Sequence, residues 1–285
     1  MSYNYLSKGY INYFIKHALH EDVGDGDHSA LGAIPEDKVN KAHLLIKDEG
    51  ILAGVEMAKM IFAHVSPEIK FEQILDDGDS VVNGQIAFNV EGSARHLLSA
   101  ERLVLNCMQR MSGVATYTHH LCGLIKGTGT KLLDTRKTTP NFRIAEKWAV
   151  KIGGGTNHRF GLFDMIMLKD NHIDYAGGVQ EAIDATVAYL EQTGKKLKIE
   201  VEVRNLEELQ EVLKSGHVFR VLLDNMLPSE MRQAIKMVGG RMETEASGGI
   251  SEKNIREIAE TGVDYISVGA MTHSYKSLDM SLKAV

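Results

Sequence analysis

The sequence predicts an α/β protein whose larger part is a barrel of parallel strands, closed or incomplete. Short apolar runs recur after residue 130, and each is followed by polar or glycine residues and then by a helix-like segment. This alternation is typical of parallel strands joined by right-handed helical crossovers. About six such units occur without the glycine-rich fingerprint of a dinucleotide-binding fold, which favours a barrel.

Residues 1–125 mix helix and strand patterns. The strands are predicted from alternating apolar residues, and the helices from apolar residues three or four positions apart. In chain order we expect a helix from about Lys8 to Leu19, a loop in EDVGDGDHS, a strand and turn in KAHLLIKDEGILAG, a helix over 54–64, two short strands around the Asn83-Gly84 turn, and helices over 94–110 and 114–125.

Six strands are expected in the second part, in the runs KLLDT, MIMLKD, KIEVEVR, RVLLDN, METEASGG and DYISVGA. Helices are expected between them in IDYAGGVQEAIDATVAYLEQ, LEELQEVLKSG, PSEMRQAIKMVGG and EKNIREIAETG. In a barrel of this kind the carboxyl ends of the strands face the active site. The side chains that follow each strand are therefore the first candidates for function.

Composition excludes several classes of protein. The chain has 285 residues, 44% hydrophobic and 25% charged, which is typical of a globular protein with one large or two moderate domains. Its formal net charge of −6 argues against general binding to nucleic acid or to an anionic membrane. No apolar run approaches the ~20 residues that span a bilayer, and no signal-peptide pattern is present, so we expect a cytoplasmic protein. Cys107 and Cys122 are expected to be buried free thiols.

One segment is unusually basic for this acidic chain. Between Lys131 and His172, Lys and Arg are about twice as numerous as Asp and Glu. A small polyanionic substrate is the simplest explanation for such a segment. Its most prominent basic residues lie near three consecutive glycines and are Arg136, Lys137, His158, Arg159 and Lys169.

Charged side chains also stand at the ends of three predicted strands, where Lys169, Glu202 and Asp224 follow apolar runs. Any one of them could be a solvated loop charge. Several charges that converge on one barrel mouth favour a functional site. Glu202 and Asp224 offer oxygen ligands that suit Mg²⁺, directly or through water, whereas no His and Cys cluster has zinc spacing.

The runs EASGGI and SVGA resemble the phosphate-binding turns of α/β barrels. Ser247 offers a hydroxyl group, and Gly248, Gly249 and Gly269 allow backbone N–H groups to approach a phosphate closely. His273 lies just beyond and could add a donor. Ordinary strand-to-helix turns and a surface histidine are the alternatives.

An ordered set of motifs resembles the quinolinate phosphoribosyltransferase family. The motifs, in chain order, are ERLVLN, DTRKTTP, GGGTNHR, MLKDNHI, EVEV, LLDN and EASGGI, and the resemblance runs from EDVGDGD to SVGA. The chain departs from the pattern at Asn141 and Trp148, where glycine and tyrosine are common, and at DHSA, which replaces the usual DxTS. None of these departures falls on a residue expected to hold substrate.

The resemblance implies an N-terminal α/β sandwich domain over residues 1–112 and an incomplete, open α/β barrel of TIM-like type over 113–271. Residues 272–285 are expected to pack back on the first domain. The implied reaction transfers the phosphoribosyl group of phosphoribosyl pyrophosphate to quinolinate with decarboxylation, giving nicotinate mononucleotide, pyrophosphate and CO₂ for NAD biosynthesis. Also implied are Mg²⁺ and a homodimer or higher oligomer whose subunits complete each other's sites, with no nucleic-acid or membrane partner.

The resemblance also assigns roles to the candidate residues. Those expected to bind quinolinate are Arg136, His158, Arg159, Lys169 and, from the other subunit, Arg102. Those expected to bind phosphoribosyl pyrophosphate are Lys137, Glu202, Asp224, Ser247, Gly248, Gly249, Gly269 and His273. The resemblance gives catalytic roles to Lys137, Lys169, Glu202 and Asp224, and Mg²⁺ binding to the last two.

Three other functions are compatible with the residues alone. A related phosphoribosyltransferase could act on a different ring, although a dicarboxylate suits the basic residues better. An aldolase or isomerase could use Lys169 or Lys137 as a Schiff-base nucleophile, but both lysines adjoin cations and polar groups rather than an apolar pocket. A non-catalytic metabolite-binding protein would not need the complete set of basic residues and carboxylates.

Overall fold

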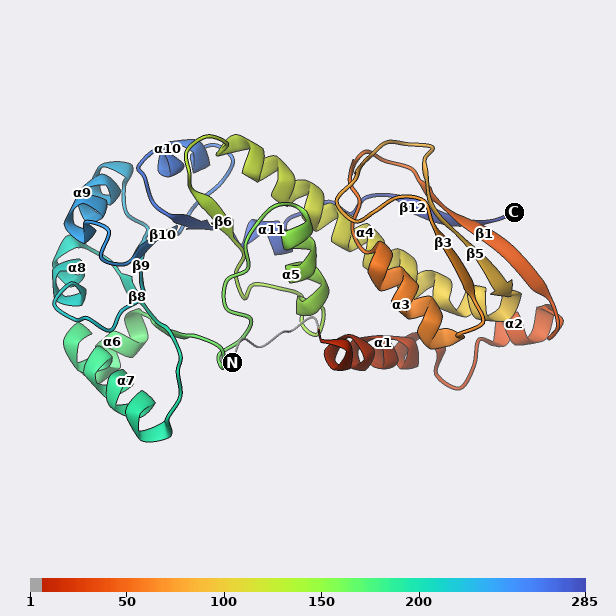
Figure 1. The fold of residues 1–285 in the computed structure, drawn as a ribbon, viewed down its shortest axis with the longest axis horizontal. Helices are drawn as coiled ribbons and strands as arrows, with labels where there is room; N and C mark the ends of the chain where they lie inside the picture. The colour runs from red at the N-terminus through yellow and green to blue at the C-terminus, as the bar shows by residue number, and fades with distance from the viewer. Residues whose placement is uncertain (1–6) are drawn as a thin grey trace. The chain divides into compact units, whose positions relative to one another are not determined.

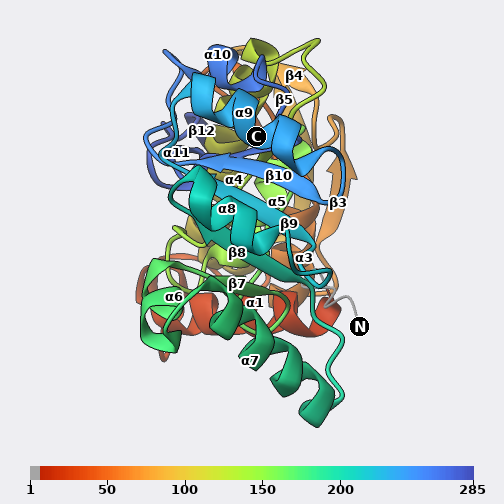
Figure 2. The same cartoon turned by 90° about the vertical axis from the view of Figure 1, so that its left-hand side faces the viewer.

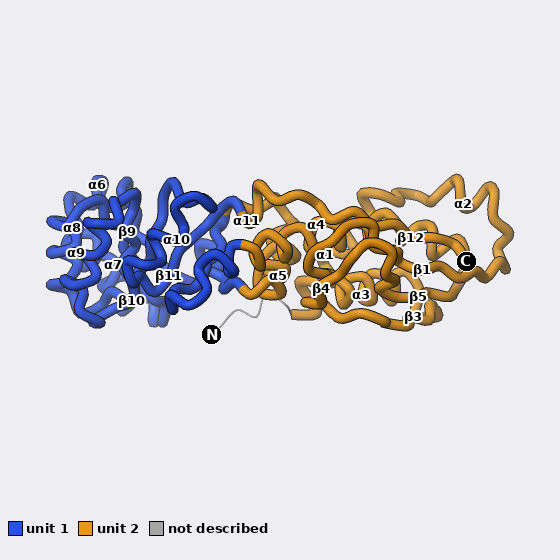
Figure 3. Tube along the Cα trace, turned by 90° about the horizontal axis from the view of Figure 1, so that it is seen from above, with its two compact units in different colours: residues 1–3, 121–136, 155–270 blue, residues 4–120, 137–154, 271–285 orange. Residues whose placement is uncertain are grey.

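The computed structural model describes residues 7–285, which form two compact units (Figure 3). Of the described residues, 121–136 and 155–270 make up one unit, which we call the parallel unit. The other, the antiparallel unit, contains 7–120, 137–154 and 271–285. Each unit has its own sheet, and the predicted α/β class is confirmed.

The antiparallel unit is built on a sheet of strand order β12-β1-β5-β3. Its strands are β1 (Val39–Ile46), β3 (Lys70–Gln73), β5 (Ile86–Ser93) and β12 (Met280–Ala284). Side chains alternate along β1, so that Ala42, Leu44 and Ile46 are buried on one face. The pairing of β12 with β1 brings the end of the chain into this sheet (Figure 1).

The antiparallel unit also contains helices, one of which packs on its sheet. The unit contains α1 (Lys8–Val23), α2 (His28–Ala33), α3 (Val55–Val65), α5 (Arg143–Ile152) and the short strands β2 (Gly50–Ile51) and β4 (Ser80–Val81). The ring centroid of Phe62 in α3 lies 6.1 Å from that of Phe88 in β5 and 6.2 Å from that of Phe71 in β3. These aromatic contacts join helix and sheet in a common core.

The helix α4 (Ala94–Leu124) is continuous over 31 residues, so the prediction of two helices over 94–110 and 114–125 is wrong. Gly113 lies where the break was expected. A Cβ atom at that position would lie 2.3 Å from the carbonyl oxygen of Lys276. The glycine therefore permits close packing against another backbone segment and does not end the helix.

The parallel unit contains, within residues 7–285, a six-stranded sheet of order β6-β11-β10-β9-β8-β7. Its strands are β6 (Lys131–Leu133), β7 (Ile166–Leu168), β8 (Ile199–Val203), β9 (Arg220–Asp224), β10 (Glu243–Ser247) and β11 (Tyr265–Ser267). Each lies in one of the six predicted apolar runs, and all the ladders are parallel. β6 and β7 are the two edges, so the described barrel is open, as expected.

The helices that follow these strands lie on the outside of the curved sheet (Figures 1 and 2). They are α6 (Asp170–Ala176), α7 (Val179–Thr193), α8 (Leu206–Val212), α9 (Pro228–Val238) and α10 (Ile255–Ala259), and the short α11 (Ala270–His273) follows β11. The single helix predicted in IDYAGGVQEAIDATVAYLEQ is wrong, because α6 and α7 are separate. Gly177 and Gly178, with φ of 97° and 155°, form the turn between them.

Strand register places polar side chains of the parallel sheet on one face, where their contacts divide them into two layers. Side chains two positions apart in a strand share a face. Glu200 therefore pairs on this face with Arg220, and Arg220 with Glu243. We call the layer that contains these residues and Glu245 the inner charged layer. Toward the carboxyl ends of the strands lies the strand-end layer, which consists of Lys169, Glu202, Asp224 and Ser247.

Candidate active site

The strand-end layer brings together Lys169 and Glu202 from neighbouring strands. Lys169 follows β7 and is the N-cap residue of α6, where its backbone N–H donates to Nδ1 of His172. Its ammonium group forms an ion pair with the Glu202 carboxylate at the end of β8. Glu202 is 7% exposed, whereas the Lys169 side chain is about half exposed. The lysine can therefore be reached by an anion while the carboxylate holds it in place.

Asp224 and Ser247 meet at the ends of β9 and β10, where their Cα atoms are paired in register. The Asn225 amide donates to Asp224 across 2.7 Å. Asn225 has φ of 53°, and a Cβ atom on Gly248 would lie 2.1 Å from its Oδ1. Gly248 is thus required by the close approach of Asn225, a contact that sequence reasoning missed.

Turns after β10 and β11 form the expected phosphate-binding region. Gly248 and Gly249 have φ of 93° and 61°, conformations that an L side chain rarely adopts. Gly269 follows β11, which pairs with β10, so the two turns leave neighbouring strands. Adjacent glycine-rich turns at the carboxyl edge of a sheet can present backbone N–H groups to a phosphate.

A loop after β6 and α5 carries Arg159. Buried Asp134 accepts hydrogen bonds from the His158 backbone N–H at 2.8 Å and from the Asn157 amide at 2.6 Å. Asp164 accepts from the backbone N–H groups of residues 160 and 161 at 2.7 and 2.9 Å. The Arg159 guanidinium donates to the Met165 carbonyl at 3.1 Å. The loop is therefore held from both sides.

Two guanidinium groups gather near this loop. Partial burial of Arg159 and the nearby positive charge of Arg136 both lower the pKa of Arg159. Like charges held together in a partly buried place favour the binding of an anion between them. Arginine is also suited to bidentate capture of a carboxylate. This pair is the strongest physical sign of an anionic substrate.

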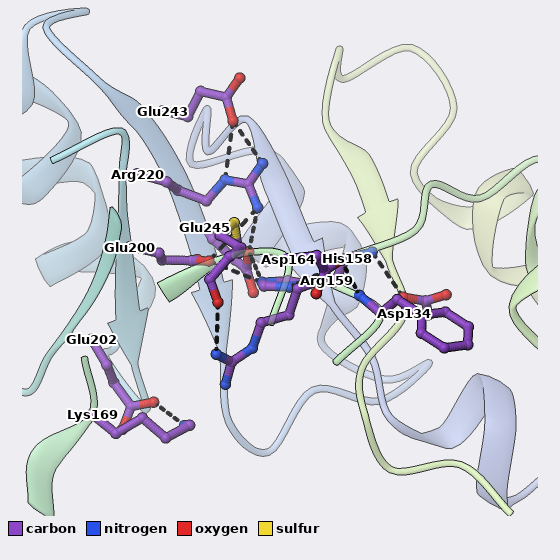
Figure 4. A network of polar contacts seen from close by, with 12 residues as sticks. Asp134, His158, Arg159, Asp164, Lys169, Glu200, Glu202, Arg220, Glu243 and Glu245 are labelled. Atoms are coloured by element: carbon purple, nitrogen blue, oxygen red, sulfur yellow. Dashed lines mark hydrogen bonds and ion pairs between the residues drawn. The ribbon is translucent and has the colours of Figure 1, made fainter. Parts of the chain in front are cut away.

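His158 points into the sheet interior, and its side chain is 6% exposed (Figure 4). Its Nε2 lies 3.0 Å from Glu200 and 3.3 Å from Glu245, and its Nδ1 accepts the Arg159 backbone N–H at 2.7 Å. Both ring nitrogens thus face groups of the protein. The assignment of His158 as a direct ligand of quinolinate stays a prediction, and this geometry favours an indirect role.

Arg220 balances the charges of the inner charged layer. Its guanidinium lies 3.1 Å from Glu245, 2.7 Å from Glu243 and 4.0 Å from Glu200. Sequence reasoning missed this layer. The available signal was the charged residues at alternate positions of EVEV and METEA, which place carboxylates on one face of strands that otherwise read as buried.

The inner charged layer holds one additional proton near neutral pH. Burial and the charge of Glu245 raise the pKa of Glu200 to about 7. Burial lowers the pKa of His158, but its hydrogen bonds to Glu200 and Glu245 raise it more, to about 9. Both shifts describe the same proton, which can lie on either group. Because the Arg159 N–H occupies Nδ1, we place this proton on the Glu200 carboxyl group.

One side-chain group among the described residues has the spacing of a metal site. His158, Glu200 and Glu245 offer ligand atoms within 4.8 Å of one another. Arg220 already supplies the compensating positive charge at 3.1 Å from Glu245. A divalent cation would add charge beside a buried guanidinium, so we assign no metal to this group.

The remaining candidates lie in the antiparallel unit. Lys137 and His273 line one pocket of about 420 Å³, together with Arg110, Tyr275 and hydroxyl-bearing side chains. The Thr272 hydroxyl donates to the Lys137 carbonyl at 2.9 Å. Two candidates that are far apart in the sequence thus meet in a basic pocket. Arg102 is exposed on α4.

The parallel unit therefore defines an open α/β barrel protein with cationic side chains and glycine turns at the carboxyl edge of its sheet. Models of the quinolinate phosphoribosyl transferase family match nearly all of the chain: the N-terminal domain matches residues 27–112 and the C-terminal domain residues 114–283. The chain belongs to this family, as the motifs predicted.

Individual relatives agree with this assignment. The chain is 46% identical over 284 residues to quinolinate phosphoribosyltransferase [decarboxylating] 1b of Nicotiana tabacum, covering 94% of this chain and 81% of that protein. It is 40% identical to the probable nicotinate-nucleotide pyrophosphorylase [carboxylating] of Bacillus subtilis, covering 94% and 91%. The crystal structure of NadC from Streptococcus pyogenes matches with a TM-score of 0.90 and 40% identity, covering 98% and 97%.

Location in the cell stays a prediction. No helix within residues 7–285 is long and apolar enough to cross a membrane. Relatives include a protein named as mitochondrial from Nicotiana tabacum and one named as chloroplastic from Arabidopsis thaliana. The expected cytoplasmic location is therefore untested by these similarities.

Proposed function

We propose that the protein transfers the phosphoribosyl group of phosphoribosyl pyrophosphate to quinolinate and releases CO₂, giving nicotinate mononucleotide and pyrophosphate in NAD biosynthesis. Family membership over nearly the whole chain supports the reaction type. The observation that carries the choice of substrate is the pair of guanidinium groups of Arg136 and Arg159. A pyridine dicarboxylate is a dianion, and it needs several fixed cations.

In this proposal Arg136, Arg159 and Lys169 bind the carboxylates of quinolinate. Lys169 is available because its ammonium group is about half exposed while Glu202 orients it. Arg102, exposed on α4, would act from a second copy of the chain. The homodimer with shared sites is thus part of the proposal.

Phosphoribosyl pyrophosphate would use the glycine turns and the carboxylates of the strand-end layer. Ser247, Gly248, Gly249 and Gly269 would hold its 5-phosphate, and Lys137 and His273 would contact the same substrate. Glu202 and Asp224 are hard oxygen donors, which fits Mg²⁺ bound directly or through water. When bound, Mg²⁺ would neutralise charge on the pyrophosphate leaving group.

The residues of the protein supply orientation and charge. The substrate itself supplies the positive ring nitrogen that makes decarboxylation possible. The pyridine nitrogen attacks C1 of the ribose as pyrophosphate departs, and positive charge develops on the sugar. The carboxylates of Glu202 and Asp224 can stabilise that charge. The product nitrogen is a pyridinium, whose positive charge stabilises the electron pair left on the adjacent ring carbon when its carboxylate departs as CO₂, and a proton then adds to that carbon. No further organic cofactor is then needed, because binding and water exclusion suffice.

Incubation with quinolinate, phosphoribosyl pyrophosphate and Mg²⁺ tests the proposal directly. We expect equimolar CO₂ and nicotinate mononucleotide, and loss of turnover in excess EDTA with recovery on adding Mg²⁺. Nicotinic acid should be a poor substrate, because it lacks the carboxylate beside the ring nitrogen and leaves a cation unpaired. Comparable kcat/KM for the two acids would move the assignment to a phosphoribosyltransferase for another ring.

A further inference from the structure

The proposed reaction leaves the most deeply buried charges of the parallel unit without a role. Glu200 and Glu245 are fully buried, and Arg220 is 7% exposed. Replacing buried ion groups by apolar residues of similar size is often neutral or stabilising. Stability alone is therefore a weak reason for three charged groups at this depth, and their contacts indicate another one.

These contacts form a continuous path from the sheet interior to Arg159. Arg220 holds Glu245 at 3.1 Å, and Glu245 and Glu200 lie 3.3 and 3.0 Å from Nε2 of His158. The opposite nitrogen of the same ring accepts the Arg159 backbone N–H at 2.7 Å. The orientation of the imidazole ring, fixed from one side, thus fixes the backbone of Arg159 on the other (Figure 4).

We propose that Glu245, Glu200 and Arg220 are positioning residues for Arg159, and that they act through His158. The inference rests on the proposed function, in which Arg159 binds a carboxylate of the substrate. Arg159 needs such support because, within residues 7–285, the hydrogen bond that holds its guanidinium is the one to the Met165 carbonyl. A guanidinium that captures a carboxylate in a fork must be placed within a fraction of an ångström.

Glu243 provides a matched control. It lies on the same strand as Glu245 and also contacts Arg220, at 2.7 Å. Unlike Glu245, it does not belong to the group of ligand atoms, found among the described residues, in which His158, Glu200 and Glu245 all lie within 4.8 Å of one another. Its side chain is one-third exposed. Glu243→Gln and Glu245→Gln thus remove the same charge from the same arginine, and only the second also removes a partner of His158.

The experiment compares steady-state kinetics of the two variants. Glu245→Gln should raise the KM for quinolinate about tenfold and leave that for phosphoribosyl pyrophosphate within about twofold. Glu243→Gln should leave both constants within about twofold of the wild type. Equal effects of the two variants, or an equal rise in both KM values for Glu245→Gln, would overturn the proposal.

A second pair of variants keeps the test decisive if Glu245→Gln does not fold. Asn at position 158 places an amide oxygen near the position of Nδ1, whereas Gln places its amide near that of Nε2. Each variant keeps one end of the path through His158 and breaks the other, so both should raise the quinolinate KM and leave that for phosphoribosyl pyrophosphate within about twofold. A wild-type quinolinate KM in His158→Asn, which has lost the contacts with Glu200 and Glu245, would overturn the proposal.

Arg159→Ala separates this inference from the proposed function. If Arg159→Ala leaves the quinolinate KM unchanged, the assignment of the substrate site fails. If Arg159→Ala raises it and Glu245→Gln does not, the substrate site stands and the positioning inference fails.

Discussion

Glu200 and Glu202 differ by two positions on one strand and point to the same face of the sheet, yet their surroundings differ. Glu200 is fully buried between Glu245 and His158, with Arg220 as its counter-charge. Glu202 lies at the strand end and pairs with the exposed ammonium group of Lys169. Depth along the strand thus separates charges that shape the protein from charges that can meet substrate.

Within the described sheet, Arg220 is the only guanidinium of the inner charged layer. We expect its replacement to have the largest effect of the changes considered, on the free energy of unfolding. Arg220→Met would leave Glu243 and Glu245 without their counter-charge. Removing one partner of a buried ion network costs about 3–5 kcal/mol in the free energy of unfolding. Urea unfolding followed by circular dichroism measures the change. A loss below about 1 kcal/mol would show that water or neighbouring groups replace the arginine.

A variant of the strand-end layer should lose activity and keep its stability. Glu202→Gln keeps the shape of the side chain but removes a carboxylate proposed to stabilise positive charge on the sugar. We expect kcat to fall about a hundredfold. The unfolding midpoint should remain close to that of the wild type, because Lys169, which loses its counter-charge, is about half exposed to water. A large loss of stability with little change in kcat would place Glu202 with the inner layer instead.

Arg159 tests whether geometry matters as well as charge. Arg159→Lys keeps the positive charge and loses the planar fork. The kcat/KM for quinolinate should fall by a factor of about 30, roughly 2 kcal/mol, and Arg159→Ala should lose still more. Full activity in the lysine variant would show that a point charge suffices and that precise positioning is unnecessary.

The contrast between the layers also explains what the sequence could predict. All six parallel strands were expected, because each is a short apolar run between polar segments. Once the strands were predicted, the polar residues at their carboxyl ends could be identified as candidates. By contrast, β3 has mostly exposed side chains at a sheet edge, and β12 is a short C-terminal strand, so neither has a strong pattern.

Contacts between segments that are distant in the chain could not be predicted from the sequence. The partnership of His158 with Glu200 and Glu245 joins a loop to two strands, and no local pattern encodes it. The same holds for Gly113 and Gly248, whose role is close packing against residues remote in the sequence. Asn141 is different: it stands where glycine is common and has φ of 61°, a conformation that asparagine tolerates better than most residues.

The smallest expected effect concerns the proton of the inner layer. Folding raises the pKa of Glu200 from 4.5 to about 7, so between these values the folded state binds more protons than the unfolded state. The contribution of Glu200 to stability is fully present below the unfolded pKa and is lost as the pH rises through the folded pKa. Glu200→Gln, a neutral side chain of the same shape, lacks this dependence.

The stability of Glu200→Gln relative to the wild type should therefore increase with pH. We expect a relative gain of about 1 kcal/mol between about pH 6 and about pH 8, measured from urea unfolding at both values. Met167→Leu, at the position paired with Glu200 in register, changes the packing without removing a titrating group and should show no such shift. A difference that is constant with pH would mean that Glu200 takes up no proton on folding in this range. The raised pKa of Glu200 would then be wrong.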